Sequence, residues 1–503
     1  MTAFLGLDIG TQGVKVLLLD PERGPLDVAA RPLTTLEGLP QGHSEQHPAD
    51  WIDAVRGALA DLRARAPADF RRIAAIGVSG QQHGLVALDA GHDVIRPAML
   101  WNDVRCAAEC REIVASLGGA AGMFASTGLA SLPPGFTAGK LRWLFRHEPA
   151  SFARLRHVLL PHDYVDLWLT GRLTAEAGDA SGTGMLDVRA RRYHDAACEA
   201  VAPGARGLLA PLCGAGDAIG TLRDELACEL DLPHGVLVAA GGGDNMMAAI
   251  GAGAVEPGVA AMSLGTSGTI FAFADQPICD SDGEIAPFCD STGHWLPLGC
   301  TMNATVATEA ARALFGRDLG VFENEVARVP VGCDGVACVP FFTGERSPDL
   351  PTATASFHGL GPRNTTAAHL ERAAMEGATF ALARLLDRLR DLGMVTRELR
   401  LTGGGSRSAT WRRIVAAACD ATVRVGIHPD AAALGAAIQA GWTWRRDRGE
   451  HALTLAAHRR SLKLDDALGE LVPSPDEVEA YCGIRAHWQH VVDAVTTTFP
   501  ETL

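Results

Sequence analysis

The amino-acid sequence predicts an α/β protein built from two similar halves. Extended and helical patterns alternate along the 503 residues, which is typical of parallel or mixed sheets covered by helices. A unit of strand, glycine turn and strand occurs near the N-terminus and again about half the chain later. A chain of this length usually divides into two or more domains, each with its own core.

The first half opens with a predicted β-hairpin. Residues 4–9 and 14–19 are rich in aliphatic side chains, and they flank the turn Gly10-Thr11-Gln12-Gly13. Apolar residues at helical spacing then predict a helix over residues 51–65. Short β-rich runs follow over residues 73–78 and 158–160.

The second half repeats the hairpin pattern. Residues 259–264 and 269–273 flank Gly265-Thr266-Ser267-Gly268, a turn that begins 255 residues after the first one. The alternative interpretation is that two unrelated hairpins share a common turn sequence. Beyond this hairpin the sequence predicts a long amphipathic helix, a strand that ends in three glycines, and a helix of small residues, over residues 370–392, 399–402 and 431–439.

The repeat places a domain boundary near residue 250. We expect an N-terminal domain over residues 1–250 and a C-terminal domain over residues 251–445. Residues 446–503 are more charged and have a helical pattern, so we expect a helical appendage without a third core.

Composition excludes several classes of function. Lys and Arg number 44 against 59 Asp and Glu, which gives a formal net charge of −15. This acidic balance argues against a nucleic-acid or membrane-surface partner. No run of about 18 apolar residues predicts a membrane span, and no basic leader precedes the first apolar run. The twelve cysteines lack a CxxC pair, so we expect reduced, mostly buried thiols and a cytoplasmic location.

The glycine turns are candidate phosphate-binding sites. Glycine lets backbone N–H groups approach a phosphate closely, and the Thr and Ser hydroxyls add further donors. A third segment of this kind, Gly403-Gly404-Gly405-Ser406-Arg407, follows the strand over residues 399–402. Three such loops can hold one nucleotide. Neither the spacing of a Walker A loop nor a G-x-G-x-x-G motif after a strand is present.

Two aspartates lie next to these segments. Asp8 ends the first strand immediately before its turn, where a Mg²⁺ that bridges phosphates needs an oxygen ligand. Asp244 follows Gly241-Gly242-Gly243 and precedes a predicted helix, so its carboxylate can accept the proton of a substrate hydroxyl. The alternative role for Asp244 is to cap that helix.

Polar clusters at strand ends are candidate ligand contacts. The sequence Ser79-Gly80-Gln81-Gln82-His83-Gly84 directly follows a β-rich run, a position that packing explains poorly and a polar ligand explains well. Trp101-Asn102-Asp103 and Pro161-His162-Asp163-Tyr164 are polar–aromatic clusters that suit the wall of a sugar pocket. Helix starts explain these two clusters equally well.

Together these motifs resemble the FGGY carbohydrate kinases. The opening segment over residues 6–11, with Lys15, is similar to the first phosphate motif of that family, and residues 136–144 and 357–376 are similar to its two signatures. Four further segments are similar to the branch of the family that acts on D-xylulose. They are Gly80-Gln81-Gln82-His83-Gly84, Leu100-Trp101-Asn102-Asp103, Gly241-Gly242-Gly243-Asp244-Asn245 and Gly344-Glu345-Arg346-Ser347-Pro348.

The resemblance implies a fold and an activity. The implied fold is two actin-like ATPase domains, each with a ribonuclease-H-like core, separated by an interdomain cleft. The implied reaction is the MgATP-dependent phosphorylation of D-xylulose to D-xylulose 5-phosphate in pentose catabolism. The implied partners are the ketose and MgATP, with neither nucleic acid nor membrane, and a homodimer is one option for the assembly.

The resemblance also implies roles for particular residues. Asp244 matches the general base, and Asp8 matches a carboxylate that holds Mg²⁺ through water. Residues implied to bind the sugar are Gln82, His83, Trp101, Asp103 and Asn245. Residues implied to bind the nucleotide are Thr11, Lys15, Gly265, Thr266, Ser267, Gly404 and Gly405. Gln82 stands where many bacterial members have Met.

Other functions remain open from the sequence. Within the kinases, D-ribulose, L-xylulose or another polyol could replace D-xylulose as the substrate. An actin-like ATPase that does not act on sugar would switch shape with nucleotide, but it would have no use for Gln82 and His83. A sugar-binding regulator without catalysis is disfavoured because Asp8 and Asp244 are both present.

Overall fold

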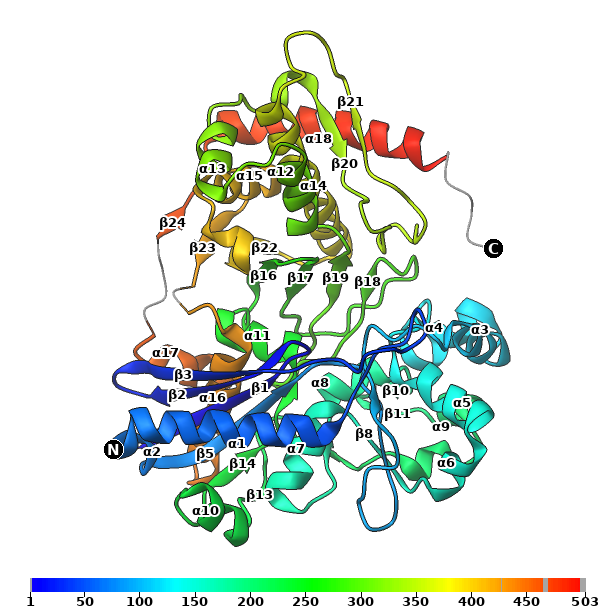
Figure 1. Ribbon diagram of the computed structural model, residues 1–503, viewed down its shortest axis with the longest axis vertical. Helices are drawn as coiled ribbons and strands as arrows, with labels where there is room; N and C mark the ends of the chain where they lie inside the picture. The colour runs from blue at the N-terminus through cyan, green and yellow to red at the C-terminus, as the bar shows by residue number, and fades with distance from the viewer. Residues whose placement is uncertain (1, 427, 465–468, 498–503) are drawn as a thin grey trace.

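The computed structural model describes residues 2–426, 428–464 and 469–497. They form two lobes, each centred on a seven-stranded sheet. In Figure 1 the first sheet lies in the lower lobe with the blue N-terminal strands, and the second lies in the upper lobe with the green strands. This mixed α/β architecture with two sheet-centred domains confirms the predicted fold class.

The first sheet contains both strands of the predicted N-terminal hairpin. In spatial order its strands are β13 (Ala218–Thr221), β14 (Leu237–Ala239), β5 (Ile73–Gly80), β1 (Ala3–Ile9), β2 (Gly13–Asp20) and β3 (Gly24–Pro32), with β15 (Gly242–Gly243) also paired to β5. Strands β1, β2 and β3 are antiparallel neighbours, whereas β1, β5 and β14 are parallel.

The second sheet repeats this pattern of directions. In spatial order its strands are β18 (Ile285–Ala286), β19 (Leu298–Thr301), β17 (Gly268–Ala272), β16 (Gly258–Leu264), β22 (Thr396–Thr402), β23 (Thr422–Val425) and β24 (Glu470–Leu471). Strands β16, β17 and β19 are antiparallel neighbours, and β16, β22 and β23 are parallel. The two glycine turns therefore occupy equivalent places in two sheets of the same topology, so the repeat is structural and not a coincidence of turn sequence.

Strand β1 is buried on both faces, which explains its continuous apolar sequence. Its odd-numbered residues, such as Leu5 and Leu7, pack in one core with Trp51 of helix α1 (Pro48–Arg65). Phe4, on the other face, packs in the core that contains helix α16 (Ala431–Asp447). Asp8 shares this second face because side chains alternate along a strand.

Helix α16 approaches the first sheet at two glycines. A Cβ on Gly6 would lie 1.9 Å from the carbonyl oxygen of Ala433, and one on Gly77 would lie 2.1 Å from that of Ala436. The small residues over 431–439, which predict close packing, thus pack against a groove formed by Gly6 of β1 and Gly77 of β5. The helix packs on the first sheet although it follows strands β16 to β23 of the second sheet in the sequence.

The second lobe is built around helix α14 (Ala367–Asp391), the long amphipathic helix that the sequence predicts. Helix α18 (Pro475–Thr496) packs against the helices and strands of this lobe and buries Tyr481 and Trp488 in its core. Helix α17 (Leu455–Ser461) instead contributes Leu455 to the core around α16. The two helices of the C-terminal segment therefore join different cores.

Other helices surround these layers. They are α2 (Pro67–Phe70), α3 (Ala107–Ser116), α4 (Gly119–Thr127), α5 (Thr137–His147), α6 (Pro149–Arg154), α7 (Pro161–Thr170), α8 (Ala177–Ala180), α9 (Asp195–Val201), α10 (Asp224–Leu230), α11 (Asp244–Ala252), α12 (Thr305–Leu314), α13 (Leu319–Val326) and α15 (Ala409–Cys419), with 3-10 turns η1 (Ser181–Thr183), η2 (Ala205–Leu208), η3 (Cys333–Gly335) and η4 (Gly404–Arg407). None of the helices in the described ranges is long and apolar enough to cross a bilayer.

Short strands form five two-stranded sheets. They are β4 (Glu45–Gln46) with β7 (Ala98–Met99), β6 (Val86–Leu88) with β8 (His157–Leu159), β9 (Ala175–Glu176) with β12 (Leu212–Cys213), β10 (Leu186–Asp187) with β11 (Arg192–Tyr193), and β20 (Ala337–Val339) with β21 (Ser356–His358). The first four of these pairs belong to the lower lobe, whose extra segments carry several of the residues that surround Asp8 and Asp244. All twelve cysteines are free thiols, and most are buried, as expected.

Candidate active site

Asp8 lies at the end of β1, between its two neighbouring strands. It pairs in register with Lys15 of β2 and Ser79 of β5, and the Ser79 hydroxyl donates a hydrogen bond of 2.8 Å to its carboxylate. Burial raises the pKa of Asp8 to about 6, although Ser79 and the cation of Lys15 oppose the shift. Lys15 in turn lies 2.7 Å from the carboxylate of Asp430, which precedes α16.

Asp244 is the first residue of helix α11, and Gly243 occupies the capping position. The Asp244 carboxylate accepts a hydrogen bond of 2.8 Å from the backbone N–H of Asn245. Burial raises the pKa of Asp244 to about 7, and the nearby carboxylates of Asp8 and Asp179 act in the same direction. A carboxyl group with this pKa can exchange a proton near neutral pH, and helix capping does not account for it.

Gln82 and Asn245 form a polar pair beside Asp244. The Nδ2 amide group of Asn245 donates to Oε1 of Gln82 over 2.8 Å, a contact that Met at position 82 could not make. The Nε2 group of Gln82 is buried and has no hydrogen-bond partner among the described residues. A buried amide donor without a partner fits a site that is completed by the oxygen of a ligand.

His83 adjoins this pair and is held in one orientation. Its Nδ1 atom lies 2.8 Å from the carbonyl oxygen of Gly182, and its ring stacks on Phe136 with centroids 4.4 Å apart. Burial lowers the pKa of His83 to about 3, with help from the cations of Lys140 and Arg346. The imidazole is therefore neutral. Because a carbonyl oxygen only accepts hydrogen bonds, Nδ1 carries the proton and Nε2 is left as an acceptor.

The first glycine turn is fixed by a chain of side-chain hydrogen bonds. The Thr11 hydroxyl donates to Gln81 over 2.8 Å and accepts from the indole N–H of Trp101 over 2.9 Å. Nε2 of Gln46 donates to the carbonyl oxygen of Thr11 over 2.7 Å. The hydroxyl proton of Thr11 is thus already used. Beside this turn a cavity of about 400 Å³ is lined by Thr11, Gln12, Leu33, Thr34, Thr35 and Glu37.

The second glycine turn lies against the third glycine segment. The carbonyl oxygen of Thr266 accepts from the backbone N–H of Ala304 over 3.1 Å, just before helix α12. A Cβ on Gly403 would lie 2.9 Å from the backbone nitrogen of Gly265, so these two segments touch. The structure therefore places Gly404 and Gly405, which follow β22, beside the turn of residues 265–267.

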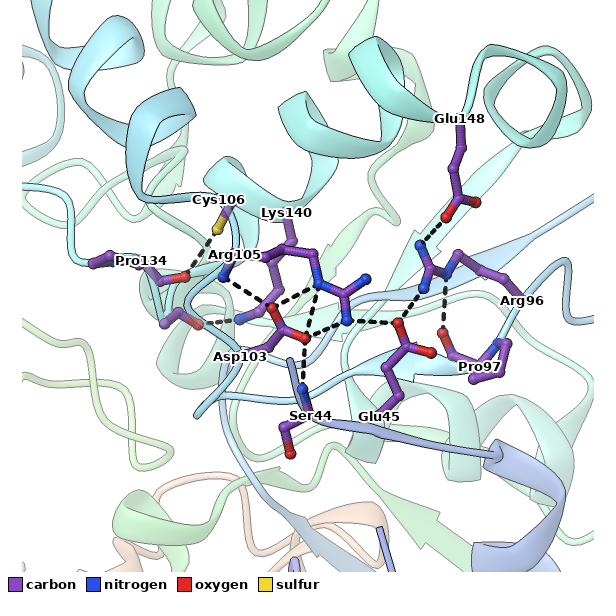
Figure 2. A network of polar contacts seen from close by, with 11 residues as sticks. Ser44, Glu45, Arg96, Pro97, Asp103, Arg105, Cys106, Pro134, Lys140 and Glu148 are labelled. Atoms are coloured by element: carbon purple, nitrogen blue, oxygen red, sulfur yellow. Dashed lines mark hydrogen bonds and ion pairs between the residues drawn. The ribbon is translucent and has the colours of Figure 1, made fainter. Parts of the chain in front are cut away.

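Asp103, which the resemblance implies as a sugar contact, has no exposed surface. Its carboxylate accepts from the backbone N–H of Ser44 over 2.8 Å and forms an ion pair of 2.6 Å with Arg105. Figure 2 shows that Arg105 also reaches Glu45, which Arg96 contacts from the other side. The carboxylate of Asp103 is therefore occupied by contacts within the protein, whereas the nearby residue Trp101 is 38% exposed.

Several contacts around the site carry no signal in the sequence. Gln46 contacts the first turn from a two-residue strand, and Asp430 reaches Lys15 from the start of α16. Arg346 belongs to the second lobe, yet its positive charge acts on His83 of the first. Each of these contacts joins segments far apart in the chain, so local patterns could not reveal them.

The fold and the site define a nucleotide-dependent phosphotransferase. Two equivalent glycine turns, one in each sheet, accompany a pair of carboxylates and a set of partly unpaired polar side chains. Among the described residues, no group of three acidic, histidine or cysteine side chains is arranged to hold a metal ion.

Comparison with known families identifies the class of kinase. The N-terminal domain of the FGGY family of carbohydrate kinases matches residues 3–251, and its C-terminal domain matches residues 260–444. The chain therefore belongs to the FGGY family of carbohydrate kinases, as its motifs suggest. It is a carbohydrate kinase, and ATP is the phosphate donor that this family uses.

Individual relatives match over most of the chain. The xylulose kinase of Haemophilus influenzae is 39% identical over 445 residues, which cover 87% of this chain and 90% of that protein. The xylulose kinase of Streptomyces coelicolor is 39% identical over 439 residues, or 87% of each chain. A crystal structure described as a xyloylose kinase from Brucella ovis has a TM-score of 0.91 at 34% identity, and the match covers 99% of this chain and 100% of that one.

Proposed function

We propose that this protein transfers the γ-phosphate of ATP to the O5 hydroxyl of D-xylulose, with Asp244 as the general base. The observation that carries the proposal is the position of Asp244, whose pKa is raised to about 7 by burial and by Asp8, beside the pair Gln82 and Asn245. The similarity to proteins named xylulose kinase supports D-xylulose as the substrate.

In the proposed reaction the sugar hydroxyl loses its proton to the carboxylate of Asp244. Its oxygen forms a bond to the γ-phosphorus of ATP, while the bond from that phosphorus to the bridging oxygen of ADP breaks. The products are D-xylulose 5-phosphate and ADP. Gln82 and His83 orient the sugar, because Nε2 of Gln82 can donate and Nε2 of His83 can accept a hydrogen bond.

Asp8 is the residue we assign to Mg²⁺, directly or through water. Its carboxylate is a hard oxygen ligand, and its repulsion of Asp244 shows an excess of negative charge that a cation would relieve. When bound, Mg²⁺ neutralises charge on the phosphate oxygens during the transfer. Ser79 orients the Asp8 carboxylate through its 2.8 Å hydrogen bond.

The glycine turns are assigned to the nucleotide. We expect the backbone N–H groups of the first turn and the ammonium group of Lys15 to lie near the transferred phosphate. Gly265, Thr266 and Ser267 would hold the remaining phosphates, and Gly404 and Gly405 would line the nucleoside. The hydroxyl of Thr11 orients the turn through Gln81, so its contribution to phosphate binding would come from the backbone.

Replacing the base tests the proposal directly. We expect Asp244→Asn to lower kcat for D-xylulose and MgATP roughly 10²–10⁴-fold, because the amide cannot take the proton. The matched control is Asp53→Asn, since the Asp53 side chain on α1 is 74% exposed. Coupled detection of ADP measures both variants. Near-wild-type turnover of Asp244→Asn would remove the general base from the proposal.

The substrate is tested by a panel that contains D-xylulose, D-ribulose, L-xylulose and polyols. We expect the highest kcat/KM with D-xylulose and little ATP hydrolysis without sugar. A preference for another sugar would reassign the substrate, and rapid hydrolysis without sugar would favour a different ATPase.

The homodimer and the cytoplasmic location stay predictions, which light scattering and cell fractionation would check.

A further inference from the structure

The backbone of His83 has an unusual conformation. Its φ angle is +66°, a left-handed value that residues other than glycine rarely adopt. Contacts that are present throughout the life of the folded protein must hold such a residue in place. The hydrogen bonds to the carbonyl oxygen of His83 show which groups hold its backbone in this conformation.

Two side chains of helix α5 hold the carbonyl oxygen of His83. The ammonium group of Lys140 donates to it over 3.0 Å, and the hydroxyl of Thr137 donates to it over 3.2 Å. Lys140 also donates to the carbonyl oxygen of Gly135. Both side chains have no exposed surface.

The ring of His83 is held by a second set of contacts. Phe136, which directly precedes α5, stacks on one face, with ring planes 16° apart. A Cβ on Gly182 would lie 2.4 Å from Nδ1, so only glycine at position 182 leaves room for the 2.8 Å contact with its carbonyl oxygen. Backbone and ring together aim Nε2 in one direction.

We propose that Lys140 and Thr137 are positioning residues, which hold His83 so that its Nε2 atom accepts a hydrogen bond from one hydroxyl of the sugar. The inference rests on the proposed function, because it takes the sugar to bind at Gln82 and His83. The inference gives helix α5 a role in sugar binding that is indirect, because the helix would act by holding His83.

The surroundings of Lys140 fit this role. Burial lowers its pKa to about 8, although the neighbouring Cys106, Asp103 and Cys110 favour the charged form. A neutral amine still has two N–H donors, and Lys140 has two carbonyl acceptors. Both hydrogen bonds can therefore persist when Lys140 loses its proton. Figure 2 shows Lys140 beside Asp103 and Arg105, the network that supports the Trp101 loop.

Steady-state kinetics separate positioning from general stability. We expect Lys140→Met to raise the KM for D-xylulose roughly tenfold to hundredfold, since a small misplacement of a binding group has effects of this size. The KM for ATP should stay within about twofold. Thr137→Val removes one donor only and should show a smaller rise, and Lys140→Gln, which keeps an N–H donor, should recover part of the loss.

The matched control lies on the same helix. Arg142 of α5 contacts Glu112 and the carbonyl oxygen of Ala200, away from His83. Arg142→Met should lower the melting temperature without changing the KM for the sugar. An equal rise in that KM for Arg142→Met and Lys140→Met would overturn the inference, because it would reveal a general loosening of α5.

A spectroscopic test needs neither substrate nor activity. With ¹⁵N-histidine labelling at pH 7.5, the His83 ring should show a protonated Nδ1 and an unprotonated Nε2, with its signals assigned by their loss in His83→Gln. In Lys140→Met or Thr137→Val we expect a mixture of the two tautomers. An unchanged single tautomer in both variants, together with an unchanged KM for the sugar, would overturn the inference.

The proposed function fails in a different way. If the wild-type protein phosphorylates none of the sugars in the panel, the proposed function is wrong, whatever the tautomer of His83. If the wild-type protein phosphorylates D-xylulose and the α5 variants keep its KM unchanged, only the positioning role is wrong.

Discussion

At the scale of residues, the site depends on two carboxylates that are far apart in sequence. Asp8 is the last residue but one of strand β1, and Asp244 follows β15, which pairs in parallel with β5. The carboxyl ends of parallel strands meet at one edge of a sheet, which is where such folds bind ligands. Burial raises the pKa of Asp8 to about 6, and burial together with repulsion from Asp8 raises the pKa of Asp244 to about 7.

The pH dependence of catalysis follows from these two pKa values. As the proposed general base, Asp244 would act only when it is ionised, so kcat/KM for D-xylulose should rise with pH and level off above about 7. Below pH 6 the protonation of Asp8 should make the decline steeper. A pH–rate profile at saturating MgATP measures both parts of this decline. A flat profile between pH 5 and 8 would contradict the general-base role of Asp244.

Removing the charge of Asp8 should change that profile in a defined direction. Without its neighbour, the pKa of Asp244 is expected to fall, so the acid limb of the residual activity in Asp8→Asn should move to lower pH. The same limb should stay in place in Asp53→Asn, whose side chain is 74% exposed. An unshifted limb in Asp8→Asn would mean that the two carboxylates do not interact.

At the scale of elements, helix α16 links the end of the chain to the beginning. Its small residues allow close approach to Gly6 and Gly77 of the first sheet and to Gly251 of α11. The same packing places Asp430, just before the helix, within 2.7 Å of Lys15. A helix from the later part of the sequence thus supports the strands on which Asp8 and Ser79 lie.

Filling this groove should destabilise the protein. A Cβ at position 77 would meet the backbone of Ala436 at 2.1 Å, which a backbone atom cannot avoid by rotation. We expect Gly77→Ala to lower the free energy of unfolding by about 1–3 kcal/mol or more. Urea denaturation measures the change. Gly207→Ala is the control, because no atom lies within 4 Å of the new Cβ; an equal loss in both variants would show that helix packing is not the cause.

At the scale of the whole molecule, the first lobe encloses an acidic cluster beside Asp244. Burial raises the pKa values of Asp163 and Glu176 to about 7 and those of Asp166 and Asp179 well above their usual range. Asp179 lies 2.5 Å from Nδ1 of His162. The folded protein therefore holds protons near neutral pH that the unfolded chain would release.

Stability should consequently fall as pH rises. Between about pH 4, where unfolded carboxyl groups ionise, and the raised pKa values of the cluster, the folded state binds more protons than the unfolded state. Alkalinisation across this window thus lowers the free energy of unfolding. Oδ1 of Asp166 has no hydrogen-bond partner among the described residues, so Asp166→Asn should raise the melting temperature at pH 8 and have less effect at pH 5.

Asp20 provides a control of opposite sign. Burial opposes its ionisation, but hydrogen bonds from Glu22, Arg72 and Arg23 outweigh burial and lower its pKa. Its stabilising effect is present above pH 4 and is lost at lower pH. Asp20→Asn should therefore lower the melting temperature at pH 8. Thermal unfolding of both variants at pH 5 and 8 makes the comparison, and a loss of stability at pH 8 in Asp166→Asn would contradict the proton account.

Much of this organisation could be predicted from the sequence because local patterns encode it. The two hairpins, the long helix α14 and the helix that begins at Asp244 appear where periodicity and glycine turns predict them. A sugar contact of Asp103 stays a prediction, because a carboxylate after an aromatic residue looks the same in a sequence whether it faces a ligand or a buried arginine. Here it faces Arg105.

The sequence by itself determined the class of fold, the repeat and the glycine turns, since these follow from short-range periodicity and turn chemistry. Only the tertiary structure decided that α16 packs on the first sheet, that Gln46 and Trp101 fix Thr11, and that Lys140 holds the backbone of His83. Those contacts join segments tens to hundreds of residues apart. Their energies depend on burial and on hydrogen-bond geometry, which exist only after the chain has folded.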